Sequence, residues 1–339
     1  GARRPRRRGG PARGARARRA RRRRPRRVRQ RTAAGRSSAP RPRGRRGHAA
    51  RRLAHAGDAG PVRRHGRREL PAPGCGRGAP APHRLRPPEE TVMSASVCIV
   101  QGVGPLAGLG ATLCRRFARE GLHVVVAGRT QEKLDAVVAA IEADGGTASA
   151  VRADATSEAD TVALFDAAVA LGPLGCAIYN AGNNTPGRIV EMEADYFERS
   201  WRLSGFGGFL FGREAVRRWH AADEAVDAPR SLLFTGASAS LRGRPNFGAF
   251  NSAKGALRNL AQAMAKEYGA EGIHVAHVVV DGGIAGDKIF KGVPKFVDMV
   301  GEDGLIDLDG LADAYWFLHG QPRSAWSFEL DLRTFKERW

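Results

Sequence analysis

A glycine-rich segment is the first stretch of this chain whose residue types could do chemistry. Residues 102–110 read Gly-Val-Gly-Pro-Leu-Ala-Gly-Leu-Gly and join an apolar run to a helical pattern. At such a junction, glycines allow a tight turn and let a pyrophosphate approach the N–H groups at the positive end of a helix. We therefore expect Gly104, Gly108, Leu109 and Gly110 to bind a dinucleotide. The alternative is a glycine-rich turn that only packs against a sheet.

Arg129 follows the second apolar run, in the sequence Val-Ala-Gly-Arg-Thr over residues 126–130. An acidic residue at this place would hold the adenosine ribose of NAD, whereas a guanidinium can pair with the 2′-phosphate of NADP. Arg129 therefore favours NADP, with NAD as the other candidate cofactor. The alternative is a solvated arginine at a strand end.

Short apolar runs alternate with helical patterns from residue 93 onward, and they must position these side chains. The predicted strands are Val97–Gln101, His123–Ala127, Thr147–Val151, Gly175–Tyr179, Ser231–Thr235, Ile273–Val280 and Ser327–Leu332. The predicted helices cover residues 108–120, 131–143, 157–171, 193–219, 249–268 and 309–319. Such alternation predicts an α/β fold, a doubly wound parallel sheet with helices on both faces. One domain over 93–339 is the simplest interpretation.

Residues 1–92 differ sharply from the remainder of the chain. They hold 31 Arg, no Lys, four acidic residues and no Phe, Trp, Tyr or Met, whereas residues 93–339 hold 25 basic and 30 acidic side chains. A segment with this charge and no aromatic residues cannot bury enough apolar surface to fold. We therefore expect it to be disordered. We favour the interpretation that residues 1–92 come from DNA translated upstream of a true start at Met93. The alternatives are a nucleic-acid-binding arm and an organelle transit peptide. The segment has no aromatic residue to stack on bases, and its prolines would break the amphipathic helix of a transit peptide.

Several classes of protein are excluded or disfavoured by composition. No apolar run reaches about 18 residues, so we expect no membrane span. The four cysteines have no metal-binding or disulfide-framework spacing, so we expect no metal and a reducing, cytoplasmic location.

Four landmarks in order resemble the short-chain dehydrogenase/reductase family over essentially all of residues 93–339. They are the glycine motif with Val103 in place of its Thr, Asp154 after the third strand, and Asn180-Ala181-Gly182 after the fourth, preceded by Tyr179. The resemblance implies a Rossmann-type fold in which Asp154 contacts adenine and Asn180, Ala181 and Gly182 line the cofactor site. It also implies a homodimer or homotetramer, for which Trp326 and Phe328 are candidate interface residues; packing within one chain is the alternative.

The catalytic positions depart from the family pattern. The family uses a Tyr as proton donor and a Lys four residues later, which holds the nicotinamide ribose and lowers the Tyr pKa. Here Lys254 is present but Phe250 replaces the Tyr. Ala237 stands at the family's Ser position and is followed by Ser238, which strand alternation would turn elsewhere. Ser204 stands at the family's Asn position.

This pattern predicts an NADP-dependent oxidoreductase that acts on a small or medium carbonyl, enone or enoyl compound. Lys254 and Ser238 are its candidate catalytic residues. The proton donor is open, with Ser238, Ser204, Tyr179, His277 and Asp281 as candidates. A relative that binds NADP without turnover is the second hypothesis, and a nucleic-acid-associated protein that uses the basic arm is the third.

Overall fold

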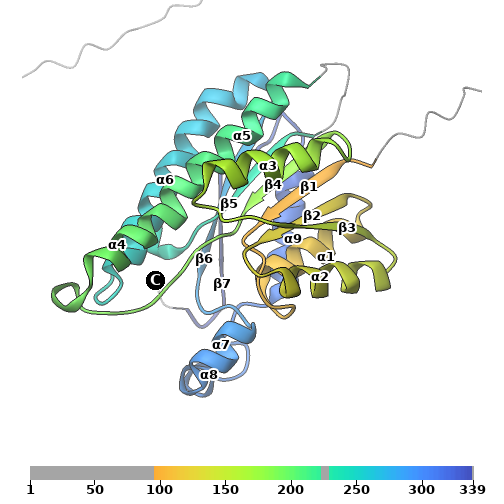
Figure 1. Ribbon diagram of the computed structural model, residues 1–339. Helices are drawn as coiled ribbons and strands as arrows, with labels where there is room; N and C mark the ends of the chain where they lie inside the picture. The colour runs from red at the N-terminus through yellow and green to blue at the C-terminus, as the bar shows by residue number, and fades with distance from the viewer. Residues whose placement is uncertain (1–94, 223–228, 338–339) are drawn as a thin grey trace, which may run out of the picture. The chain divides into compact units, whose positions relative to one another are not determined.

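The computed structural model describes residues 95–222 and 229–337, and the segment predicted to be disordered lies outside them. Its centre is a seven-stranded parallel sheet in the order β3-β2-β1-β4-β5-β6-β7 (Figure 1). The strands are β1 Val97–Gln101, β2 His123–Gly128, β3 Thr147–Arg152, β4 Leu174–Tyr179, β5 Ser231–Thr235, β6 His274–Asp281 and β7 Glu329–Arg333. The strand order reverses between β1 and β4, as a doubly wound sheet requires. The predicted fold class is confirmed.

The central strands form because their residues are apolar on both faces. Every residue of β1, β4, β5 and β6 is buried, which is typical of a parallel sheet covered on two sides. The edge strand β3 is only partly buried, as is β7 at the other edge. The register between neighbours is regular, and Val97 to Gln101 pair in order with His123 to Ala127.

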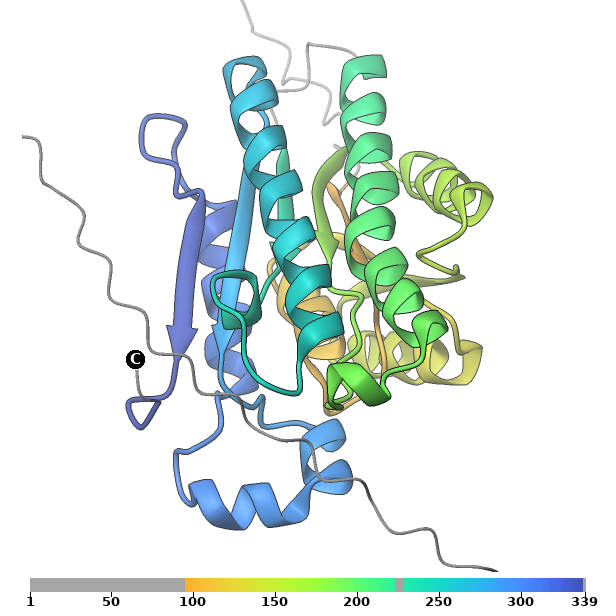
Figure 2. The same cartoon turned by 90° about the vertical axis from the view of Figure 1, so that its left-hand side faces the viewer.

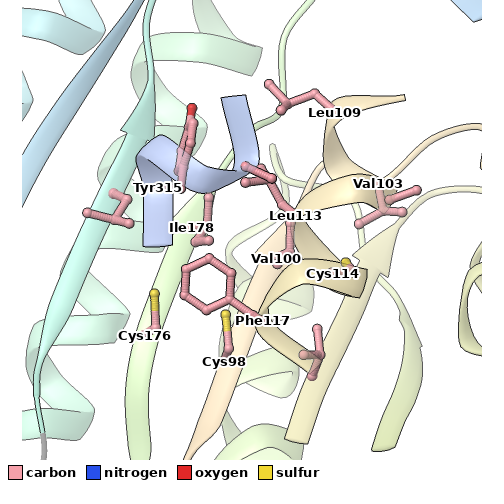
Figure 3. Close-up of a cluster of buried hydrophobic side chains, with 14 of the residues drawn as sticks. Cys98, Val100, Val103, Leu109, Leu113, Cys114, Phe117, Cys176, Ile178 and Tyr315 are labelled. Carbon is pink, nitrogen blue, oxygen red and sulfur yellow. The ribbon is translucent and has the colours of Figure 1, made fainter. Parts of the chain in front are cut away.

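Helices cover both faces of the sheet (Figures 1 and 2). The α-helices are α1 Leu109–Arg119, α2 Gln131–Ala143, α3 Glu158–Val169, α4 Ala194–Trp201, α5 Gly207–Ala221, α6 Gly248–Tyr268, α7 Asp287–Gly292, α8 Pro294–Val300 and α9 Leu308–His319. Helices α1, α2 and α9 share one core cluster with the sheet, whereas α3, α5 and α6 share the other. Figure 3 shows the first cluster, in which Phe117 of α1 packs near Val100, Ile178 and Tyr315.

Two sequence predictions about helices were incomplete. The single helix predicted for residues 193–219 is interrupted by the π-helical turn η2 Arg202–Phe206, which separates α4 from α5. Residues 284–308, for which no helix was predicted, contain α7 and α8. Three short 3-10 turns complete the described structure: η1 Ile189–Glu191, η3 Ser238–Ser240 and η4 Gly269–Glu271.

Trp326 and Phe328, the candidate interface residues, both contact their own chain. The Trp326 ring stacks on His274 with ring centroids 4.9 Å apart, and Phe328 stacks on His277 at 6.5 Å. Neither residue is fully exposed, so packing within the monomer accounts for much of their surface. Within the described ranges, no helix is both long and apolar enough to cross a bilayer.

Candidate functional site

The predicted cofactor residues gather at the carboxyl ends of the strands, beside the reversal in strand order. The glycine segment leaves β1, Arg129 follows β2, Asp154 follows β3 and Asn180 follows β4. Because parallel strands end at one edge, residues from four separate stretches of sequence come to line one edge of the sheet.

Two glycines at this edge are required by close packing, and a third borders free space. Gly102 has a φ of 97°, and a Cβ there would lie 2.4 Å from the backbone nitrogen of Ala181. A Cβ at Gly110 would lie 3.0 Å from Val103 Cα, whereas a Cβ at Gly104 would meet no atom within 4 Å. Gly104 therefore borders free space. Gly102 was missed by the sequence analysis, although its place directly after β1 was a signal.

Helix α1 begins at Leu109 with Gly108 as its N-cap, and no side chain caps it. The N–H groups of its first turn are consequently available to an anion. Leu109 offers only its backbone here, because its side chain is buried in the core cluster that also contains Val103 (Figure 3).

Arg129 and Asp154 differ in their local contacts. Arg129 is exposed and has no ion pair within the described ranges. Asp154 is half-buried, and its Oδ1 accepts hydrogen bonds from the backbone N–H and the hydroxyl of Thr156, both at 2.9 Å. Its carboxylate therefore also holds the turn that follows β3.

Asn180 ties three strand ends together. Its Nδ2 donates to the carbonyl of Gly102 at 3.2 Å, and its Oδ1 accepts from Thr235 Oγ1 at 3.0 Å. Since the Thr235 hydroxyl donates to Asn180, the Tyr315 hydroxyl, 2.6 Å away, must donate to Thr235. This network fixes the ends of β1, β4 and β5 relative to each other.

Lys254 lies on α6 and its side chain is only 4 % exposed. Its ammonium donates to the carbonyl of Thr235 at 2.7 Å, and a Cβ at Gly182 would lie 3.3 Å from Nζ. Burial, with a smaller effect from the positive charge of Lys288, lowers its pKa to about 8. The structure thus brings Lys254 next to the Asn180–Gly182 segment.

Phe250 lies one helical turn before Lys254, with the ammonium 6.0 Å from its ring centroid. Ser238 begins η3, and its carbonyl accepts from the N–H groups of Leu241 and Arg242 at 3.0 and 3.2 Å. Strand β5 ends at Thr235, so strand alternation does not decide the direction of the Ser238 side chain. That argument against Ser238 therefore does not apply.

Three of the candidate proton donors already make structural contacts. Tyr179 is fully buried and donates to the carbonyl of Leu203, and burial, with a smaller effect from Asp154, raises its pKa far above the usual range. His277 is fully buried, its pKa is lowered to about 4 mainly by burial, and its Nδ1–H donates to Glu329 at 3.1 Å. Asp281 is 1 % exposed and forms an ion pair with Arg242 at 3.2 Å.

Ser204 differs from these three residues. It lies in the π-helical turn η2 and is fully buried, and its hydroxyl has no hydrogen-bond partner in the part of the chain that the structure describes. Single-turn π insertions occur often at functional sites, but sequence patterns do not reveal them.

The segment that follows β6 reaches back to the glycine loop. The backbone N–H of Asp287, the first residue of α7, donates to the carbonyl of Ala107 at 2.8 Å. The next residue is Lys288, whose charge acts on Lys254. The start of α7 is thus fixed to the glycine loop at the cofactor edge. No group of metal-binding side chains is found among the described residues.

Comparison with known proteins gives consistent matches. Residues 97–287 match the family described as short chain dehydrogenase. YuxG of Bacillus subtilis (strain 168), an uncharacterized oxidoreductase, is 33% identical over 209 residues, which are 61% of this chain and 29% of that protein. The chain therefore spans less than a third of that relative. Elsinochrome reductase 1 of Elsinoe fawcettii is 30% identical over 197 residues, 58% of this chain and 70% of that protein.

A solved structure agrees with these sequence matches. The short-chain dehydrogenase from Rhodopseudomonas palustris is 36% identical, with a TM-score of 0.59, and the match covers 71% of this chain and 99% of that one.

Proposed function

Since this chain belongs to the short-chain dehydrogenase family of oxidoreductases, we propose that it reduces a small or medium organic carbonyl, enone or enoyl compound with NADPH. NADH is the alternative reductant. Elsinochrome reductase 1 is named for a reduction, which supports this direction of reaction here.

The residues at the cofactor edge fit a dinucleotide. Gly104 borders open space and the uncapped first turn of α1 offers N–H groups, which suits a pyrophosphate. Arg129 is exposed without an ion pair among the described residues, which suits a 2′-phosphate. Asp154 and the Asn180–Gly182 segment would border the adenine and ribose. When bound, the cofactor supplies the hydride.

The observation that carries the proposal is the burial of Lys254. Its ammonium is held by one carbonyl, that of Thr235, and has no carboxylate partner within the described ranges. Burial of a charge without a counter-ion is unfavourable, so a purely structural role does not explain this lysine. A role in orienting a cofactor ribose beside Gly182 does explain it.

Phe250 restricts the chemistry, because a phenyl ring cannot donate a proton. Reduction of an activated carbon–carbon double bond is compatible with this site, since the carbonyl oxygen then needs only polarisation and the proton can come from water or another group. Ser238, at the start of η3 and 7 % exposed, is the proposed group that polarises the oxygen.

A second candidate function is NADP binding without turnover. The observation in its favour is that Phe250, Ala237 and Ser204 stand where the family has its Tyr, Ser and Asn. The third hypothesis, nucleic-acid binding, rests on residues 1–92, which lie outside the described ranges.

Consumption of NADPH, followed at saturating cofactor against a panel of ketones and enones, tests the proposal. We expect turnover with at least one compound that is lost in Lys254→Ala. Normal NADPH binding with no turnover across the panel would favour the second candidate.

We further propose a homodimer or homotetramer. Three aromatic side chains on α4 and α5 are exposed, namely Phe197 (43%), Trp201 (42%) and Phe209 (40%), and such surface is typical of an interface. Light scattering coupled to size-exclusion chromatography measures the assembly directly.

A further inference from the structure

A recess lies at the amino ends of the central strands, opposite the carboxyl ends where the cofactor residues gather. It has a volume of about 200 Å³ and lies where β5 and β6 begin and α9 ends. Six of its lining residues matter for what it could bind: Arg230, Ser231, His274, His319, Arg323 and Trp326. The proposed reduction uses none of them.

The charges around this recess have one sign. Two guanidinium groups and two imidazole rings line it, and no carboxylate among the described residues does. Glu271 precedes the lining residue Gly272, but its carboxylate is paired with His220 at 2.6 Å. Neither Arg230 nor Arg323 has an ion pair within the described ranges. The guanidinium groups are thus available to an added anion.

The inner wall is held in place by hydrogen bonds and stacking. His274 is 4 % exposed, its Nε2–H donates to the carbonyl of Ser327 at 2.9 Å, and its ring stacks on Trp326 at 4.9 Å with 4° between the planes. His319 is 8 % exposed, and its Nδ1 is 2.6 Å from Ser231 Oγ. The wall is therefore pre-organised, while the two arginines stand nearer the solvent.

A buried polar atom adds an independent observation. His274 Nδ1 is buried and makes no hydrogen bond of good geometry in the described part of the chain, although the Leu318 backbone lies within reach of the ring. Buried polar groups are normally satisfied, so each exception needs an explanation. Burial lowers the pKa of His274, whereas a bound anion would favour the protonated ring, in which Nδ1 also carries a donor.

From these observations we propose that this recess is a binding site for a small oxyanion, a phosphate or a carboxylate group. Guanidinium groups bind both groups through paired N–H donors. The volume is below the roughly 300–1,000 Å³ of pockets for drug-sized ligands, so a small anion or the anionic end of a small molecule fits.

Protection of arginines from phenylglyoxal, mapped by mass spectrometry on the full chain, tests this proposal residue by residue. The reaction is run in about 0.15 M NaCl, which screens exposed charges. At inorganic phosphate of about four times Kd, Arg230 and Arg323 should react about fivefold more slowly, because the unbound fraction is then one fifth. Arg119, which is exposed and has no ion pair within the described ranges, is the control and should be unaffected.

A variant and a second anion sharpen the test. Arg323→Ala should abolish the protection of Arg230, because both guanidinium groups hold the same anion. An acetate arm separates the two sources: protection by both anions supports a general oxyanion site, and protection by phosphate alone supports a phosphate site. Equal protection of Arg119, or none at Arg230 and Arg323, would overturn the proposal.

The chain's own acidic residues provide a further check. Asp223, Glu224 and Asp227 precede Arg230 and lie outside the described residues. In a variant with Asp223→Asn, Glu224→Gln and Asp227→Asn, phosphate should protect Arg230 and Arg323 as strongly as in the natural chain. Protection seen only in this variant would contradict the proposal, since the chain's own carboxylates would then be the occupants.

Discussion

Replacement of Lys254 by Met should stabilise the folded protein near neutral pH. Burial lowers the pKa of this lysine from 10.5 to about 8, so the fold disfavours its charge by about 3 kcal/mol. Loss of the hydrogen bond to the Thr235 carbonyl offsets about 1 kcal/mol of this gain. We therefore expect a net stabilisation of about 2 kcal/mol at pH 7.

The sign of the pH dependence follows from proton binding. Between pH 8 and pH 10.5 the unfolded chain keeps the proton on Lys254 while the folded protein releases it, so the free energy of unfolding of the natural protein rises with pH. The advantage of Lys254→Met is thus full below pH 8 and shrinks through this window.

Urea unfolding of both proteins from pH 7 to pH 10 measures this difference. Lys266→Met is the matched control, because Lys266 is exposed on the same helix and should show neither the gain nor the slope. A Lys254→Met protein that is less stable than the natural protein at pH 7 would refute this expectation. A difference in their free energies of unfolding that does not change with pH would also refute it, because the buried charge would then not destabilise the fold.

Three further changes have defined outcomes. Arg129→Asp should weaken NADPH binding by about 1.5–3 kcal/mol and leave NADH binding equal or better, by fluorescence titration; equal losses for both would show that Arg129 does not contact the 2′-phosphate. Phe250→Tyr should raise the rate of ketone reduction within the roughly 10²–10⁴-fold range of general acid catalysis, in an NADPH assay; no gain, with enone activity in the natural protein, would favour double-bond reduction. Gly102→Ala should lower the free energy of unfolding by about 1–3 kcal/mol, because its Cβ would lie 2.4 Å from the Ala181 nitrogen; unchanged urea unfolding would show that the loop can relax.

The sheet could be predicted because its strands are apolar on both faces. The runs at Val97–Gln101 and Ser231–Thr235 have the observed bounds, and the other strands differ by a few residues at their ends. The π-helical turn at Arg202–Phe206 could not be predicted, because its residues suit an α-helix equally well. Helices α7 and α8 contain no buried residue, so no apolar period marked them.

The candidate site was predictable as a set of positions but not as a set of contacts. The family resemblance assigned Asn180 and Lys254 to one cofactor site, and the structure joins both to Thr235, which no motif indicated. Tyr179 and His277 were reasonable proton donors by residue type. Their hydrogen bonds to Leu203 and Glu329 depend on tertiary packing, which a linear pattern does not contain.

The central claim is that this site transfers hydride rather than merely binding a dinucleotide. The most direct measurement is transfer of deuterium from NADPH labelled at the nicotinamide C4, detected by mass spectrometry in the products of a ketone and enone panel. The proposed function predicts one deuterium on the reduced carbon of at least one product, and none with Lys254→Ala. Saturated NADPH binding without deuterium in any product would contradict it.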